Sequence, residues 1–134
     1  MVLQIGVKLI LHRSDGKVLL LKRSLSDSKR KNMSEKWDIP GGRINSSENL
    51  LNGLKREVEE ETGITIKGSP KLLDAQDIFP TDDVHVVRLT YLLNTEDVNI
   101  TLSEEHQDFG WFDPAEASVL SLDKYLFKVL GELK

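Results

Sequence analysis

Four glutamates lie close together in the middle of the sequence: Glu57, Glu59, Glu60 and Glu61. On a helix, where each residue turns the chain by about 100°, Glu57, Glu60 and Glu61 share one face and Glu59 points the other way. Carboxylates on one face repel one another, and near the C-terminal end of a helix they also oppose the macrodipole. A divalent cation bound among them would remove both penalties, so a metal site is one interpretation of this spacing.

The glutamates are expected to lie on a helix from about residue 48 to 62. Apolar residues recur there at helical spacing, at Leu50, Leu51, Leu54 and Val58. Ser47 is the expected N-cap and Gly63 the expected C-terminal stop.

A solvated, salt-bridged helix face is the alternative to a metal site. Two pairs have the i, i+4 spacing of helical ion pairs, Lys55 with Glu59 and Arg56 with Glu60. These pairs leave Glu57 and Glu61 without a partner. On the helix alone, both interpretations stay open.

A glycine turn precedes this helix. Residues 37–42 read Trp-Asp-Ile-Pro-Gly-Gly, which predicts a short strand that ends in a turn. The successive glycines Gly41 and Gly42 permit a close backbone approach that other residues forbid. A longer pattern starts at Gly42, and its further fixed positions are Glu48, Arg56, Glu57, Val58, Glu60, Glu61, Gly63 and Ile64.

This pattern resembles the Nudix box, the signature of the Nudix hydrolases, and every fixed position of the box is present. Looser resemblance extends over most of the chain. Gly53 and Leu54 stand where the family often has alanines, a departure that concerns helix packing. The resemblance implies an α/β fold, a Nudix-type α/β/α sandwich with a mixed central sheet, in a single domain over residues 1–134.

The resemblance also implies an activity and its ligands. Nudix enzymes hydrolyse nucleoside diphosphate derivatives with a divalent metal, usually Mg²⁺, with Mn²⁺ as an alternative. By position, the metal ligands are the Gly42 carbonyl and the carboxylates of Glu57, Glu60 and Glu61. Arg56 is expected to orient the glutamates through charge-assisted hydrogen bonds. The candidate catalytic residues are Glu57, Glu60 and Arg56.

In this family, one more ligand or general base comes from outside the box, shortly before a downstream aromatic residue. Glu105, six residues before Trp111, is the candidate metal ligand here. The alternative is an acidic, solvated loop. His106 could act as a base, although a lone histidine in a loop more often lies simply at the surface.

Five residues are candidates for substrate binding: Arg23, Trp37, Gly41, Phe79 and Arg88. Arg23 lies where related triphosphatases place a phosphate-binding arginine, and an edge-strand surface charge is the alternative. Trp37 and Phe79 could stack on a base, but aromatic residues at strand ends more often belong to the core or its rim. The basic stretch 24–35 is either a solvated segment or a flap that meets the substrate.

Composition agrees with a small cytoplasmic enzyme. The chain has 134 residues and a mass of 15.2 kDa, enough to bury one core. The net charge of −4 and the lack of a basic stripe argue against nucleic-acid binding, and no stretch is long enough to span a membrane. The absence of cysteine excludes a disulfide framework and thiolate metal sites.

Strands are expected at about 2–11, 17–22, 36–39, 70–78, 84–94 and 106–112. A terminal amphipathic helix is predicted by apolar residues at helical spacing, which are Leu122, Tyr125, Leu126, Val129, Leu130 and Leu133. That stripe is interpreted as core packing, with a dimer interface as the alternative. The chain is therefore expected to be a monomer or a homodimer.

The expected function is Mg²⁺-dependent hydrolysis of a nucleoside triphosphate to a monophosphate and pyrophosphate, with oxidised nucleotides as one substrate class. Cleavage of ADP-ribose or a nucleotide sugar is an alternative, since Pro80 lies 16 residues after Ile64, as in ADP-ribose hydrolases. Cleavage of dinucleoside polyphosphates is another. A catalytically inactive ligand-sensing module is the non-enzyme alternative, and the intact set of box glutamates argues against it. Cap removal from RNA is disfavoured by the lack of a basic surface.

Overall fold

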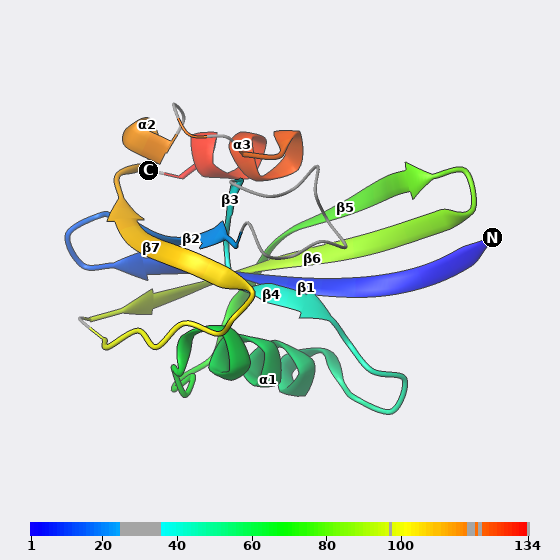
Figure 1. Cartoon of the computed structure of the whole chain (residues 1–134), viewed down its shortest axis with the longest axis horizontal. Coiled ribbons are helices and arrows are strands. Elements are labelled where there is room, and N and C mark those ends of the chain that lie inside the picture. Colours follow the sequence, from blue (N-terminus) through cyan, green and yellow to red (C-terminus); the bar gives the residue numbers. More distant parts are fainter. Residues whose placement is uncertain (25–35, 97, 118–119, 121, 134) are drawn as a thin grey trace.

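The computed structural model describes residues 1–24, 36–96, 98–117, 120 and 122–133. Its sheet has seven strands: β1 Val2–Arg13, β2 Val18–Arg23, β3 Trp37–Asp38, β4 Gly41–Arg43, β5 Lys71–Thr81, β6 Val84–Thr95 and β7 His106–Phe112. The described helices are α1 Leu50–Thr62, α2 Pro114–Ala117 and α3 Lys124–Gly131 (Figure 1). Of the basic stretch 24–35, residues 25–35 lie outside the described residues.

The sheet is mixed, as predicted. Its main order is β3-β2-β1-β6-β5, with β4 paired to β1 and β7 paired to β2. β1 and β6 run parallel along their whole length, from Val2 opposite Val84 to Arg13 opposite Thr95, and every other pairing is antiparallel. The long β1–β6 pair therefore forms the rigid centre on which the other strands are arranged.

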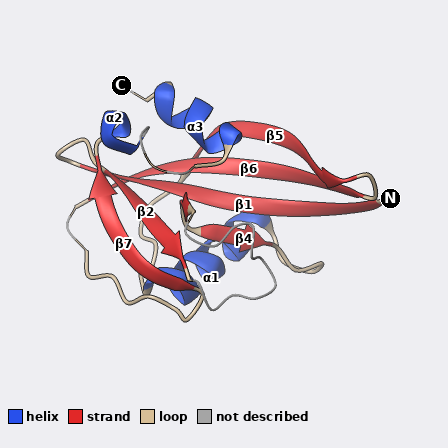
Figure 2. Ribbon diagram, turned by 45° about the horizontal axis from the view of Figure 1, so that its top comes forward, coloured by secondary structure: helices blue, strands red, loops and turns tan. Residues whose placement is uncertain are grey.

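Helices cover both faces of this sheet, with α1 on one side and α2 and α3 on the other (Figures 1 and 2). β1 alternates between the two layers, as strand geometry requires. Leu9 packs in one buried cluster with Leu54 and Val58 of α1, whereas Ile10 packs in another with Leu126 of α3. The predicted α/β/α sandwich is confirmed.

α1 begins two residues later than expected. Asn49, and not Ser47, is the N-cap, and its side chain accepts a hydrogen bond from the backbone N–H of Asn52 at 2.8 Å. Serine and asparagine cap equally well, so propensity alone could not choose between them. Gly63 ends the helix with φ of 75°, in the left-handed region that favours glycine, as predicted.

The terminal helix packs against the sheet. Asp123 caps α3, and the apolar stripe buries Leu126, Val129 and Leu130 against the sheet face opposite α1. The interpretation of this stripe as core packing is therefore confirmed. The helix is shorter than the stripe, because Leu122 and Leu133 lie outside α3 while still contacting the same cluster.

β1 pairs with two different antiparallel strands along its length. Residues Gly6–Lys8 pair with β4, whereas His12 pairs with Val18 of β2. Between these pairings, the Leu9 N–H donates to the carbonyl of Pro40 at 2.9 Å. The sheet opens at this divergence, beside the C-terminal half of α1.

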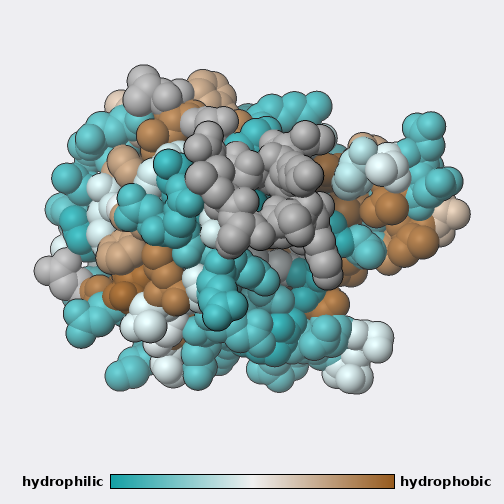
Figure 3. All heavy atoms as spheres, viewed as in Figure 1, coloured by the Kyte–Doolittle hydropathy of each residue, from teal (hydrophilic) through white to brown (hydrophobic). Residues whose placement is uncertain are grey.

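The surface over α1 is mostly hydrophilic, and apolar side chains are exposed at the N-terminal end of the sheet, where Met1, Val2 and Leu3 lie (Figure 3). Among the residues described, no helix has both the length and the apolar character to span a membrane.

Candidate active site

A cleft of about 370 Å³ lies where the strands diverge. It is lined by most of the predicted site residues: Arg23, Gly41, Gly42, Glu57, Glu61, Arg88 and Glu105. They come from β2, β4, α1, β6 and the segment before β7, so residues far apart in the sequence are brought to one place. The predicted residues Arg56, Glu60, Trp37 and Phe79 do not line this cleft.

Glu57 lies directly against the glycine turn. A Cβ atom added to Gly42 would stand 2.6 Å from Glu57 Oε2, so any side chain there would displace the Glu57 carboxylate. Gly42 is therefore the residue that allows the carboxylate to approach the backbone of β4. The same contact puts Glu57 beside the Gly42 backbone, as is required if the two residues are to bind one metal ion.

Glu61 is the most deeply buried acid of α1, with a side-chain exposure of 8%. Its Oε1 accepts a hydrogen bond from the Gly41 N–H at 2.7 Å. Burial raises the pKa of Glu61 from 4.5 to about 7, against the opposing effects of Lys8 and of the Gly41 N–H. A buried carboxylate in a cleft, with its charge only partly compensated, is a site where a cation would be stabilised.

Arg56 does not line the cleft, but it holds two of the acids through hydrogen bonds. Its guanidinium donates to both oxygens of Glu48, at 2.7 and 3.0 Å, and to Glu57 Oε1 at 2.9 Å. The hydrogen bonds from Arg56, followed by that from the Asn45 N–H, lower the pKa of Glu48 to about 2. Glu57 therefore does have a partner, contrary to the expectation from i, i+4 spacing.

Glu60 is exposed and lies outside the lining of the cleft. Its side chain is 59% exposed, and its carboxylate lies 3.3 Å from the Arg56 guanidinium. The predicted Arg56–Glu60 pair is therefore present. Exposed pairs of this kind contribute little to stability.

Glu105 and His106 face Glu61 from the segment that leads into β7. A ligand atom from each of these three side chains lies within 4.8 Å of the others. His106 is buried, with its Nε2 atom 3.9 Å from Glu61 Oε2. The expectation that this histidine lies at the surface is therefore wrong, because β7 carries it beneath the cleft.

Two ion pairs also line the cleft, and sequence reasoning missed three of their four members. Lys8 Nζ lies 2.8 Å from Asp38, and the Arg88 guanidinium binds both oxygens of Asp123 at 3.0 and 3.1 Å. All four residues line the cleft. One available signal was Lys8, a cation that with Gln4 interrupts the apolar run of the first ten residues.

The two aromatic candidates lie elsewhere. Trp37 packs edge-on against Phe112, with ring centroids 5.2 Å apart, in the cluster beneath α3. Phe79 is 59% exposed and stacks on His85 at 4.5 Å. Ile78 and Pro80, its neighbours on β5, line the cleft instead, because successive residues of a strand face opposite sides.

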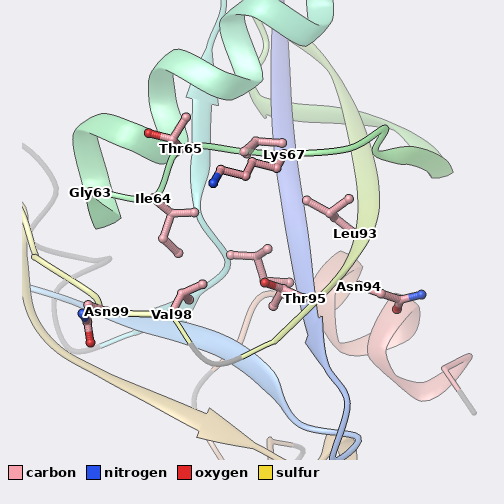
Figure 4. A pocket seen from close by; sticks show the side chains of 11 residues that line it. Gly63, Ile64, Thr65, Lys67, Leu93, Asn94, Thr95, Val98 and Asn99 are labelled. Atoms are coloured by element: carbon pink, nitrogen blue, oxygen red, sulfur yellow. The ribbon is translucent and has the colours of Figure 1, made fainter.

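A second hollow, of about 350 Å³, lies beyond the C-terminal end of α1 (Figure 4). Its labelled residues include Thr65, Lys67, Asn94 and Asn99. No carboxylate or imidazole is found among the described residues that line it. It therefore offers a cation fewer suitable donors than the cleft does.

The donors in the cleft fit a divalent metal. Glu57, Glu61 and Glu105 supply hard carboxylate oxygens, and the adjacent glycine turn supplies backbone carbonyls. Arg23, Lys8 and Arg88 bring positive charge to the same cleft. The arrangement can thus offer oxygen ligands to a cation and basic groups to an anion, as phosphate chemistry requires.

Comparison with known proteins agrees with this chemistry. Residues 2–131 match the family of the NUDIX domain. The chain is 27% identical to nucleoside triphosphatase NudI of Escherichia fergusonii, over 89% of each chain. Its structure resembles that of the MutT protein from Methanosarcina mazei Go1, with a TM-score of 0.83 and 28% identity, covering 98% of this chain and 92% of the other. It also resembles the MutT NUDIX hydrolase from Burkholderia pseudomallei, with a TM-score of 0.83, 26% identity and full coverage of both chains.

Proposed function

The chain belongs to the NUDIX family of hydrolases, which act on phosphorus-containing acid anhydrides, and from this premise we propose that it is a Mg²⁺-dependent nucleoside triphosphate pyrophosphohydrolase. In this reaction water attacks phosphorus and breaks one P–O–P bridge. The products are a nucleoside monophosphate and pyrophosphate. Oxidised nucleotides are one class of substrate that the proposal includes.

One observation carries the proposal. The cleft brings three carboxylates, of Glu57, Glu61 and Glu105, together with basic side chains. The basic side chains that line it are Lys8, Arg23 and Arg88, of which Lys8 and Arg88 also pair with aspartates. A triphosphate bound in this cleft would have oxygens available to a cation and to the basic groups at once, which is how phosphoryl-transfer sites position their substrates.

In this proposal each residue of the site has its own role. Glu57, Glu61 and Glu105, with the Gly42 carbonyl, hold Mg²⁺, which when bound offsets phosphate charge and acidifies or positions water. Arg56 holds Glu57 in place through its hydrogen bond at 2.9 Å. A cleft carboxylate accepts the proton of the attacking water, and Arg23 binds phosphate.

Similarity to a triphosphatase supports this choice of substrate class. NudI is named as a nucleoside triphosphatase, and its similarity spans 89% of both chains. The nucleoside itself is the open part of the proposal, because Trp37 and Phe79, the aromatic candidates for base stacking, lie outside the cleft.

A substrate screen tests the proposal. Purified protein would be incubated with Mg²⁺ and a panel of nucleoside triphosphates, oxidised nucleotides, ADP-ribose, nucleotide sugars and dinucleoside polyphosphates, with products resolved by chromatography. The proposal expects a monophosphate and pyrophosphate from at least one triphosphate. Preferred cleavage of ADP-ribose to AMP and ribose phosphate would overturn the substrate class while leaving the chemistry intact.

A further inference from the structure

The arrangement around His106 differs from that of an ordinary core histidine. Its side chain is 4% exposed, yet it faces the acid Glu61 across 3.9 Å, a gap longer than a hydrogen bond. Glu105, the next residue along the chain, adds a carboxylate oxygen to the same cluster and lines the cleft. Two carboxylates and one imidazole therefore converge on a space between them.

The separation matches two ligands of one cation. Ligand atoms about 2.1 Å from a shared metal lie about 3 Å apart in adjacent octahedral positions and about 4.2 Å apart in opposite ones. The distance of 3.9 Å between His106 Nε2 and Glu61 Oε2 lies between these two values. A small rotation of the two side chains would bring both atoms to bonding distance of one cation.

A β-bulge turns His106 toward the cluster. Lys22 of β2 pairs with Asp108, whereas Arg23 pairs with His106, so Gln107 is an extra residue in β7. His106 is buried while Asp108, two residues further along, is exposed. Regular alternation would place these two side chains on the same face, and the bulge is what separates them.

Backbone hydrogen bonds fix the cluster on both sides. The Ser103 N–H donates to the carbonyl of Glu61 at 3.3 Å, and the His106 N–H donates to the carbonyl of Ser103 at 3.3 Å. Directly after β2, the Ser24 N–H donates to the carbonyl of Glu105 at 2.8 Å. The segment that carries Glu105 and His106 is thus tied directly to the residue that it faces.

We propose that His106 Nε2 is a metal ligand alongside Glu61 and Glu105, and that this nitrogen donor makes the site selective for a transition metal such as Mn²⁺ over Mg²⁺. Imidazole binds divalent first-row transition metals, Mn²⁺ the most weakly of them, whereas Mg²⁺ is bound almost entirely by oxygen. This inference deepens the proposed function, because it concerns the metal site of that reaction.

Pulsed electron paramagnetic resonance of the full chain with Mn²⁺ alone tests the inference without any substitution. A histidine nitrogen bound to Mn²⁺ gives a ¹⁴N coupling, and ¹⁵N labelling of histidine alone must convert it to a ¹⁵N coupling. We expect that conversion in the wild-type protein. Bound Mn²⁺ with no histidine nitrogen coupling would overturn the inference and leave the proposed function standing, whereas no Mn²⁺ binding at millimolar concentration would count against both.

Variants give a second readout. His106→Gln should abolish the nitrogen coupling and weaken Mn²⁺ binding in calorimetry by about tenfold or more, with a smaller effect on Mg²⁺. His85→Gln is the matched control, because His85 stacks on Phe79 outside the cleft and should leave both affinities unchanged. Equal loss of Mn²⁺ and Mg²⁺ affinity in a folded His106→Gln protein would contradict selectivity by nitrogen.

Discussion

Arg56 and Glu48 are joined by two parallel hydrogen bonds, of 2.7 and 3.0 Å, which hold the guanidinium in one orientation. From this position, Arg56 Nη1 reaches Glu57 Oε1 at 2.9 Å. Glu48, the first glutamate of the box, therefore acts indirectly. It holds Arg56 in place, and Arg56 in turn holds the candidate metal ligand Glu57. This relationship explains why the pattern requires an acid so far ahead of the other glutamates.

Glu48→Gln should reduce turnover by about ten- to hundredfold while the protein stays folded. The substitution keeps the shape of the side chain but removes the charge that holds Arg56, so Glu57 loses its fixed position. Steady-state kinetics with Mg²⁺ would measure the loss.

Glu59→Gln is the matched control for this change, because Glu59 is exposed on the opposite side of α1. Its turnover should equal that of the wild type. Equal losses in the two variants would contradict the positioning role of Glu48.

Glu57→Gln should weaken Mg²⁺ binding by about tenfold or more, because it replaces a carboxylate ligand that lies against Gly42 with a neutral amide. Isothermal titration calorimetry of the folded variant would measure the change. Unaltered Mg²⁺ affinity would show that the ion binds elsewhere.

Without metal, the protein should lose stability as pH rises from about 4.5 to about 7, because of Glu61. Its pKa is 4.5 ordinarily and about 7 in the fold. Between these values the folded state keeps a proton that the unfolded state has released, so raising the pH favours unfolding, by about 3 kcal/mol at most. Urea unfolding with a chelator, at pH 5 and pH 7.5, would measure this.

Two comparisons isolate the Glu61 contribution from that of other titrating groups. Glu61→Gln should be less sensitive to this pH change than the wild type, and Mg²⁺ should stabilise the wild type more at pH 7.5 than at pH 5. If the substitution left the pH dependence of unfolding unchanged, burial of this carboxylate would not have the assigned effect.

Asp123→Asn should destabilise the protein by about 1–3 kcal/mol at neutral pH. Asparagine can still cap α3, so the loss reports mainly on the ion pair with Arg88. Burial alone would raise the pKa of Asp123, but the hydrogen bonds and charge of Arg88 outweigh it and lower the pKa. The contribution of this ion pair to the stability of the fold is therefore present above the ordinary pKa of aspartate and is lost as pH falls.

Urea unfolding at pH 7 and at pH 3 would measure the Asp123 effect. Asp77→Asn is the control, because Asp77 is 70% exposed where it meets His85. We expect Asp77→Asn to lower the free energy of unfolding by less than about 0.5 kcal/mol. A cost for Asp123→Asn that did not shrink toward low pH would contradict the ion-pair explanation.

The sequence predicted those helices and strands whose own residue pattern agrees with their place in the fold. The apolar repeat of α1 and the glycine at its end gave the helix and its stop, and residues 106–112 were predicted as the strand that β7 forms. β4 was not predicted, since Gly41 and Gly42 have low strand propensity and pair only because β1 lies beside them. The short helix α2 was also missed.

The site was only partly predictable, for a physical reason. The spacing of the box determines which acids share a helix face, and Glu57 and Glu61 do line one cleft. The burial of His106 depends on a β-bulge, which arises from the register between β2 and β7 and has no local signature in the sequence. Likewise, Asp123 meets Arg88 only because α3 packs beside β6.

Product analysis of Glu61→Gln beside the wild type, with Mg²⁺ and the preferred triphosphate, tests the central claim most directly. The account predicts monophosphate and pyrophosphate from the wild type, and turnover lower by several orders of magnitude in a variant whose circular dichroism and thermal unfolding show an intact fold. Near-normal formation of the same products by that variant would contradict the assignment of the glutamate cleft as the site of hydrolysis.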